Sequence, residues 1–191
     1  MTVSLLAVAA SYRPDSHNKL LLDIAIEKAK SHGAAVTVLD YNALESPMFK
    51  EEDSLPHELP KGAKILADAL LAHDGLLLAT PEYNWSIPAS LKNLIDWLSV
   101  DVRAPFSGKT ALLLSASPSV RGGITGLMQL RVPLEVLHVW VYPQLISVGK
   151  AHEVIKEGEL LAKKEYDFLD THVAQFVKAS AQLSGQSHDV S

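Results

Sequence analysis

Five segments of the chain consist almost entirely of apolar residues and show no alternation of polar and apolar positions. They occupy residues 5–9, 36–39, 75–79, 111–114 and, in a weaker form, 139–148. A strand with one solvent-exposed side alternates polar and apolar residues, whereas a strand covered by helices on both faces does not. The pattern therefore predicts five strands of a buried parallel sheet.

Between these segments the apolar residues recur every three or four positions, which is the period of a helix with one buried side. The predicted helices span residues 18–32, 63–72, 88–98, 126–137 and 159–183. Because strand and helix alternate five times, we predict an α/β fold. Its core is a doubly wound, five-stranded parallel sheet with helices on both faces.

The chain of 191 residues is long enough for one domain with a substantial core, and we assign residues 1–183 to this domain. Residues 184–191 are polar and are expected to form a C-terminal tail. Residues 45–60 contain three prolines and an acidic run. We interpret them as an exposed loop within the domain.

The apolar run near the N-terminus superficially resembles the end of a signal peptide. A secretory signal requires a basic region before the apolar run, and no Lys or Arg precedes this one. No stretch of the chain approaches the roughly 20 apolar residues of a membrane span. We therefore expect a cytoplasmic protein without a membrane partner.

Composition narrows the classes of partner. The 17 Lys and Arg against 22 Asp and Glu give a net charge of −5, so there is no basic excess to displace counterions from a nucleic acid. Cysteine is absent and the eight histidines are scattered, so neither a disulfide framework nor a metal site is expected. A small anionic ligand stays possible, because a local cluster of N–H groups can hold one in an acidic protein.

Ligands of open α/β sheets bind beyond the carboxyl ends of the strands, near the point where the strand order reverses. Three loops that leave predicted strand ends carry unusual polar residues: residues 10–18, 80–88 and 115–123. We expect these loops to converge in space and to form the functional site.

The first loop carries two hydroxyl groups, an amide and a guanidinium immediately before a predicted helix: Ser11, Ser16, Asn18 and Arg13. The helix start adds unpaired N–H groups and the positive end of the helix dipole, which together suit a phosphate monoester. The alternative is that Ser16 or Asn18 only caps the helix and that Arg13 is solvated. No G-x-G-x-x-G follows the first strand, so the Rossmann mode of binding NAD is not predicted.

The second loop places two aromatic residues, an amide and a carboxylate between Pro81 and Pro88. A stiff surface with flat and polar groups suits the edge of a planar heteroaromatic ring, which needs both stacking and hydrogen bonds. The alternative is that Tyr83 and Trp85 are ordinary packing residues.

Residues 81–93 read P-E-Y-N-W-S-I-P-A-S-L-K-N. This segment resembles the P-E-Y-N-x-S-x-P-G-x-L-K-N signature of the NAD(P)H-dependent FMN reductase family, whose fold is flavodoxin-like. The first loop is similar to the family's G-S-x-R-x-x-S-x-N phosphate loop, and residues 115–131 resemble its third segment. Ala10 and Ala89 stand where the family has Gly, and neither change removes a ligand group.

The resemblance implies a role for each loop. The FMN phosphate is held by residues of the first loop: Ser11, Arg13, Ser16, His17 and Asn18. The isoalloxazine ring is bordered by the second loop, largely through backbone groups: Pro81, Glu82, Tyr83 and Asn84, with Ser86 and Ile87 close by. Ser115 and Ser117 line the opposite side of the ring.

The resemblance also implies the activity of an oxidoreductase, an NAD(P)H-dependent FMN reductase or quinone reductase. NADPH or NADH is the expected hydride donor. The electrons then pass from FMN to a small-molecule acceptor such as a quinone, a free flavin, an azo compound or a metal oxyanion. No catalytic side chain is implied, because the flavin carries the chemistry. The family further implies that a second subunit covers the ring, so we expect a homodimer or homotetramer.

Some alternatives stay open at this point. A flavodoxin-type electron carrier that binds FMN without NAD(P)H turnover is the alternative function, and a module that has lost its flavin is a third. Arg121 and Arg131 suit either the phosphates of NADPH or an acidic substrate, and equally a solvated or inter-subunit position. The pattern does not name the physiological acceptor, and it does not separate NADPH from NADH or dimer from tetramer.

Overall fold

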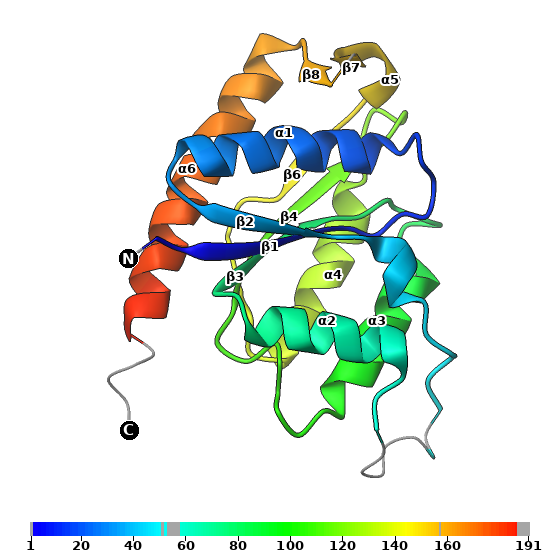
Figure 1. Cartoon of the computed structure of the whole chain (residues 1–191). Helices are drawn as coiled ribbons and strands as arrows, with labels where there is room; N and C mark the ends of the chain where they lie inside the picture. Colours follow the sequence, from blue (N-terminus) through cyan, green and yellow to red (C-terminus); the bar gives the residue numbers. More distant parts are fainter. Residues whose placement is uncertain (1, 51, 53–57, 157, 187–191) are drawn as a thin grey trace.

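The apolar segments form one parallel sheet, which the computed structural model places at the centre of the molecule (Figure 1). The structure describes residues 2–50, 52, 58–156 and 158–186. The strands follow the order β2-β1-β3-β4-β5, and all neighbours on this path are parallel. This order confirms the predicted doubly wound, flavodoxin-like sheet. The strands are β1 (Ser4–Ala9), β2 (Ala35–Leu39), β3 (Gly75–Ala79), β4 (Thr110–Ala116) and β5 (Trp140–Val141).

The fifth position of the sheet is divided between two short strands. β5 pairs with the first two residues of β4, and β6 (Ile146–Val148) pairs with the last three. Pro143 lies between them and has no N–H group to donate to a ladder. The single strand predicted over residues 139–148 is therefore wrong for its middle part, residues 142–145.

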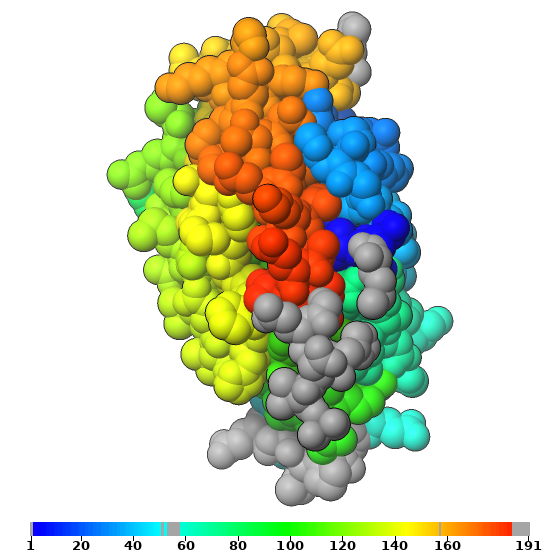
Figure 2. Space-filling model, turned by 90° about the vertical axis from the view of Figure 1, so that its left-hand side faces the viewer, coloured from blue at the N-terminus to red at the C-terminus, as the bar shows by residue number. Residues whose placement is uncertain are grey.

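Helices cover both faces of the sheet, as the period of the apolar positions predicts. One face carries α1 (His17–Ser31) and α6 (Lys163–Gln186), and the other carries α2 (Lys61–Leu71), α3 (Ala89–Ser99) and α4 (Ile124–Val136) (Figure 1). The first four predicted helices agree with these bounds to within two residues at each end. In Figure 2, α6 runs along the side of the molecule from orange to red, between blue residues near the N-terminus and the yellow segment after α4.

The two faces of the sheet have separate cores. Leu77 and Leu112 pack with α1 and α6, whereas Leu6 and Leu113 pack with α2, α3 and α4, and all four are fully buried. Burial on both faces explains the continuous apolar runs of β1, β3 and β4, because every side chain of a central strand leaves water. In β1, β3 and β4, polar side chains consequently stand only at or next to the strand ends: Ser4, Thr110 and Ser115. The prediction of burial on both faces is wrong for β2, which lies at the edge of the sheet and has Val38 59% exposed.

The segment before the last helix differs from the prediction. A helix is predicted from residue 159, but α5 (Ala151–Val154) leads first into a hairpin of β7 (Ile155–Lys156) and β8 (Glu159–Leu160). Ile155 and Leu160 face each other in this hairpin and are both buried in the core, which favours the hairpin over an earlier helix start. At its other end α6 reaches Gln186, so residues 184–186 of the predicted tail are helical. Residues 187–191 lie outside the described residues.

The predicted loop at residues 45–60 is anchored to α3. Residues 45–50 of this loop follow the short 3-10 helix η1 (Tyr41–Leu44) and, like residues 58–60, belong to no helix or strand, whereas residue 52 has 3-10 geometry. The Asn93 side chain accepts from Phe49 N–H at 2.7 Å and donates to the carbonyl of Pro47 at 2.9 Å, and Trp97 Nε1 donates to the same carbonyl at 2.8 Å. The remaining residues of the loop, 51 and 53–57, lie outside the described residues.

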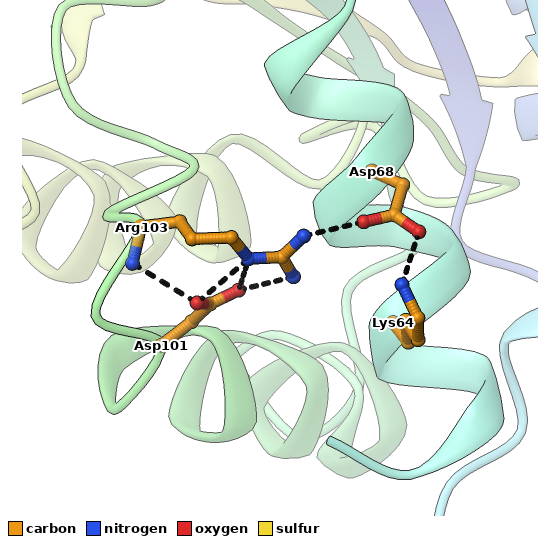
Figure 3. Close-up of polar contacts among 4 residues, drawn as sticks. All are labelled: Lys64, Asp68, Asp101 and Arg103. Carbon is orange, nitrogen blue, oxygen red and sulfur yellow. Dashed lines mark hydrogen bonds and ion pairs between the residues drawn. The ribbon is translucent and has the colours of Figure 1, made fainter. Parts of the chain in front are cut away.

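A charged network joins the segment after α3 to α2 (Figure 3). Arg103 forms ion pairs with Asp101 and with Asp68, each at 2.6 Å, and Asp68 also pairs with Lys64 at 2.7 Å. The Arg103 guanidinium lowers the pKa of Asp101, while Lys64 and then Arg103 lower the pKa of Asp68. Lys64, Asp68 and Arg103 are exposed, so the ion pairs of Asp68 align the two segments more than they stabilise the fold, whereas the Asp101 side chain is only 6% exposed.

Candidate functional site

The three polar loops converge at the carboxyl ends of β1, β3 and β4, on the right-hand side of Figure 1. β1 and β3 are neighbours in the sheet, and the strand order reverses there. A hollow of about 230 Å³ lies between the loops. It is lined by Ser11, Arg13, Ser16, His17, Asn18, Pro81, Glu82, Tyr83, Ala116, Ser117 and Pro118.

The start of α1 is capped and tied to β4. Ser16 is the N-cap residue, and its hydroxyl accepts from Asn18 N–H at 3.2 Å. The Asn18 side chain accepts from Ala116 N–H at 2.9 Å and donates to the Ala116 carbonyl at 3.1 Å. The capping interpretation is therefore confirmed for Ser16. Asn18 holds two walls of the hollow together across 98 positions of sequence.

The same helix start presents unused hydrogen-bonding groups to the hollow. Within the described residues, the backbone N–H groups of Ser16 and His17 donate to no protein acceptor. His17 lines the hollow, and its Nδ1 atom is buried without a partner among the residues that the structure describes. Buried polar atoms in proteins are nearly always paired, so an unpaired one at a ligand site indicates a missing partner.

Arg13 lies at the mouth of the hollow with its side chain 69% exposed. Its guanidinium donates to the Asp15 carboxylate at 3.0 and 3.3 Å. Asp15 raises the pKa of Arg13, and Arg13 lowers the pKa of Asp15. Arg13 is thus exposed, as the solvated alternative implies, but it is paired, and a phosphate has to share it with Asp15.

The second loop forms a tight hairpin turn. Tyr83 and Ser86 exchange backbone hydrogen bonds at 2.9 and 3.0 Å, and the two residues between them, Asn84 and Trp85, have φ of 50° and 66°. Positive φ at both central positions defines a type I′ turn, which Asn tolerates and a bulky residue such as Trp does not. Backbone strain of this kind collects at functional sites.

The carboxylate of Glu82 is engaged by α4. Its Oε2 accepts from Gly126 N–H, in the first turn of that helix, at 2.7 Å. A negative group at a helix N-terminus is stabilised by the unpaired N–H groups and the dipole there. Glu82 therefore leaves mainly its backbone to border the hollow, as the resemblance implies.

The third loop is built around a glycine that Ser115 requires. Ser115 is fully buried, and its Oγ has no partner within the described part of the chain. A Cβ atom on Gly123 would lie 2.1 Å from this oxygen, and Gly123 has φ of +84°. Only glycine satisfies both conditions, so the loop passes directly over Ser115.

Four of the thirteen predicted residues do not line the hollow. Asn84 is exposed on the turn, Ser86 pairs with Tyr83, Ile87 packs into the core, and Ser115 lies beneath Gly123. The prediction missed Ala116 and Pro118, which line the hollow beside Ser117. Their place in the third loop is the available signal, since neither carries a polar side chain.

Arg121 and Arg131, whose roles the sequence leaves open, have different surroundings in the structure. Arg131 pairs with Glu135 at 2.8 Å and donates to the carbonyls of Tyr142 and Pro143, where the fifth strand is interrupted. Arg121 lies over the ring of Trp85, 4.5 Å from its centroid. Arg131 therefore supports the fold, whereas Arg121 joins the second and third loops of the site.

The arrangement fits an FMN phosphate. A phosphate accepts hydrogen bonds and carries negative charge, and the hollow supplies unused N–H groups at a helix N-terminus, an unpaired His17 nitrogen and the Arg13 guanidinium. The described residues hold no cluster of His, Asp and Glu arranged for a metal ion. None of the described helices combines the length and apolar character needed to cross a bilayer.

Comparison with known proteins agrees with this site. The model of a family described as NADPH-dependent FMN reductase matches residues 3–153. The NAD(P)H-dependent FMN reductase of Pseudomonas aeruginosa is 31% identical over 169 residues, which cover 87% of this chain and 89% of that protein. The quinone reductase of Escherichia coli is 36% identical over 135 residues, or 64% and 72% of the two chains. The NAD(P)H:(acceptor) oxidoreductase FerB of Paracoccus denitrificans shares the fold, with a TM-score of 0.80 at 23% identity, over 95% and 98% of the two chains.

Proposed function

The chain belongs to the NADPH-dependent FMN reductase family, and we propose on this premise that the hollow beyond β1, β3 and β4 binds FMN. The protein is an FMN-dependent NAD(P)H oxidoreductase. The observation that carries the assignment of the site is the set of unused donors at the start of α1, at the switch point of the sheet. When bound there, FMN would supply the redox chemistry that links NAD(P)H to an electron acceptor.

In this proposal the first loop holds the phosphate. The N–H groups of Ser16 and His17 and the Nδ1 atom of His17 face the phosphate, and the hydroxyl of Ser11 and the guanidinium of Arg13 complete the site. Asn18 contributes by fixing the start of α1 against β4. The contacts are short, so they outweigh the repulsion from a net charge of −5, which is screened over about 8 Å.

The ring of FMN lies between the second and third loops. The backbone of residues 81–84 borders one side, where Glu82 is held by α4 and Asn84 by the strained turn, with Ser86 and Ile87 behind them. Ser117 borders the other side, and Ser115 lies behind it, beneath Gly123. No side chain here is required as a nucleophile or general base. The role of these loops is to orient the ring and to leave one face open to the nucleotide.

The acceptor is a small molecule such as a quinone, a free flavin, an azo compound or a metal oxyanion. Residues 1–183 form the single FMN-binding domain of this proposal, and its place is the cytoplasm. The isoalloxazine ring of FMN at the open edge of the sheet would be exposed to solvent in a monomer. In this proposal a second subunit of a homodimer or homotetramer covers it. A stripe of exposed apolar residues on α4 supports such an assembly: Met128, Val132 and Val136, which are 59%, 63% and 70% exposed.

Absorbance spectra before and after addition of NADPH under anaerobic conditions test the proposal. The purified protein is expected to show the absorbance bands of flavin in the visible range. NADPH or NADH is expected to bleach these bands rapidly without another enzyme. A bound flavin that neither nucleotide reduces would identify the electron carrier instead. A colourless protein that fails to bind added FMN would refute the flavin site altogether.

A further inference from the structure

One arginine of this chain has no carboxylate partner among the residues that the structure describes. Of the four arginines in the sequence, Arg13 pairs with Asp15, Arg103 with Asp101, and Arg131 with Glu135. Arg121 is exposed and forms no ion pair with any of the described residues. This protein has more carboxylates than cationic side chains, and an exposed arginine that pairs with none of the described carboxylates is available to bind an external anion.

Arg121 is also held in a defined position. Its guanidinium lies 4.5 Å from the centroid of the Trp85 ring, which is itself fixed at the tip of the strained turn. This contact engages none of the guanidinium N–H groups in a hydrogen bond to a described residue, so they are free to donate to a ligand. An arginine presented in this way is suited to bind a phosphate through two parallel hydrogen bonds.

The backbone on both sides of Arg121 is rigid. A Cβ atom on Gly122 would lie 2.7 Å from the backbone nitrogen of Gly149, and one on Gly149 would lie 2.2 Å from the carbonyl oxygen of Val120. Lys150 N–H donates to the Ser119 carbonyl at 3.0 Å. The third loop is therefore packed closely against residues 148–150, so Arg121 extends from a fixed base toward the second loop.

The position of the Arg121–Trp85 pair favours contact with the nicotinamide nucleotide and not with FMN. The donors for the FMN phosphate come from the first loop, whereas Arg121 belongs to the third loop and Trp85 to the second. These two loops border the proposed ring site, where the hydride donor must approach. A phosphate of that donor is then the anion that reaches this edge of the site.

We propose that Arg121, positioned by Trp85, binds a phosphate group of the nicotinamide nucleotide. The inference rests on the proposed function, because it assumes that the nucleotide meets a flavin between the second and third loops. Two phosphate groups share this chemistry, the 2′-phosphate that only NADPH carries and the pyrophosphate common to NADPH and NADH. Contact with the 2′-phosphate makes Arg121 a determinant of the preference for NADPH.

The test compares variants of the FMN-loaded protein. Arg121→Ala removes the guanidinium, Trp85→Leu removes the stacking surface, and Trp85→Phe keeps an aromatic ring. Lys178→Ala is the matched control, because it removes one positive charge from an exposed position on α6, whose end contacts the start of β4 at the opposite edge of the sheet. KM and kcat are measured with NADPH and with NADH, and calorimetry measures the binding of adenosine 2′,5′-bisphosphate and of ADP.

Arg121→Ala is expected to raise KM for NADPH roughly tenfold and to leave kcat nearly unchanged. The reason is that the variant loses one charge-assisted contact with the nucleotide, and this contact is equally strong in the ground state and in the transition state. Trp85→Leu is expected to raise the same KM, and Trp85→Phe to restore it in part. Lys178→Ala is expected to change neither constant.

The two nucleotides distinguish the phosphate groups. An effect confined to NADPH and adenosine 2′,5′-bisphosphate places the 2′-phosphate on Arg121, and an equal effect on NADH and ADP places the pyrophosphate there. Unchanged KM and unchanged binding of both probes would overturn the inference. Failure of the proposed function is a different result, because the wild-type flavin would then be reduced by neither nucleotide, while the calorimetric arm would still decide whether Arg121 binds a phosphate.

Discussion

Several polar residues in and around the proposed site hold the fold together through their side chains. Asn18 uses both ends of its amide on Ala116, and Glu82 uses its carboxylate on Gly126. Asn93, the last residue of the second motif, holds residues 46–49 by three hydrogen bonds. Asn18, Glu82 and Asn93 therefore shape the loops around the proposed site, although each belongs to a motif associated with ligand binding.

Arg13 is the exposed charge of the proposed phosphate site, and its replacement tests that proposal directly. Arg13→Ala is expected to weaken FMN binding roughly tenfold without unfolding the protein, because one charge-assisted contact is lost at the surface. Fluorescence titration of the apoprotein with FMN measures the affinity. Asp15→Asn serves as the control, since it removes the carboxylate that shares Arg13 and is expected to leave binding equal or tighter. Unchanged affinity in Arg13→Ala would exclude this residue from the site.

Among the helices and strands, some features follow from local sequence patterns and others depend on contacts between residues far apart in the chain. The four helices between the strands begin and end close to their predicted bounds, because their apolar period and end signals are local. The interrupted fifth strand and the β7–β8 hairpin escaped prediction. The first depends on Pro143 and on Arg131 from α4, and the second on the burial of Ile155 and Leu160 in a distant core.

We expect the ion pairs between α2 and the segment that follows α3 to stabilise the protein in a pH-dependent way. The pKa of Asp101 in the folded protein lies below its ordinary value of 3.8 because Arg103 stabilises the carboxylate. The stabilisation is complete above that ordinary value and is lost as the pH falls through the lower folded-state pKa. Arg103→Ala is therefore expected to lower Tm by a few degrees at pH 7 and to have a vanishing effect in strong acid.

Thermal unfolding followed by circular dichroism between pH 2 and pH 7 measures this dependence. Asp101→Asn is the partner variant, and adding it to Arg103→Ala should cost less than the two single changes combined, because both remove the same interaction (Figure 3). A Tm difference between wild type and Arg103→Ala that stays constant down to pH 2 would contradict the assignment.

At the level of the whole molecule, the negative charge and the chemistry of the site are compatible. The net charge of −5 is spread over the surface, while the donors for an anion are concentrated at one edge of the sheet. The absence of cysteine means that electrons cannot pass through a protein dithiol. Electron transfer therefore depends on the bound flavin and on whatever covers its ring.

The assembly is tested by the mass in solution. Multi-angle light scattering of the wild type is expected to give two or four times the chain mass of 20.7 kDa. Val132→Glu places a charge in the exposed stripe of α4 and is expected to shift the mass toward the monomer. Val38→Glu is the control, because Val38 on the edge strand β2 is similarly exposed, at 59% against 63%. A monomeric wild type would refute the homo-oligomer.

The sequence by itself determined the alternation of strands and helices, the three loops that form the site and, through its motifs, the family. These features are local, since burial on both faces leaves a continuous apolar run and a loop motif is contiguous in the chain. Only the tertiary structure decided which polar groups remain free for a ligand. Asn18 and Ala116 are 98 positions apart and Glu82 and Gly126 are 44 apart. Whether such groups pair with each other or face the hollow depends on how the strands and helices pack, which no local pattern records.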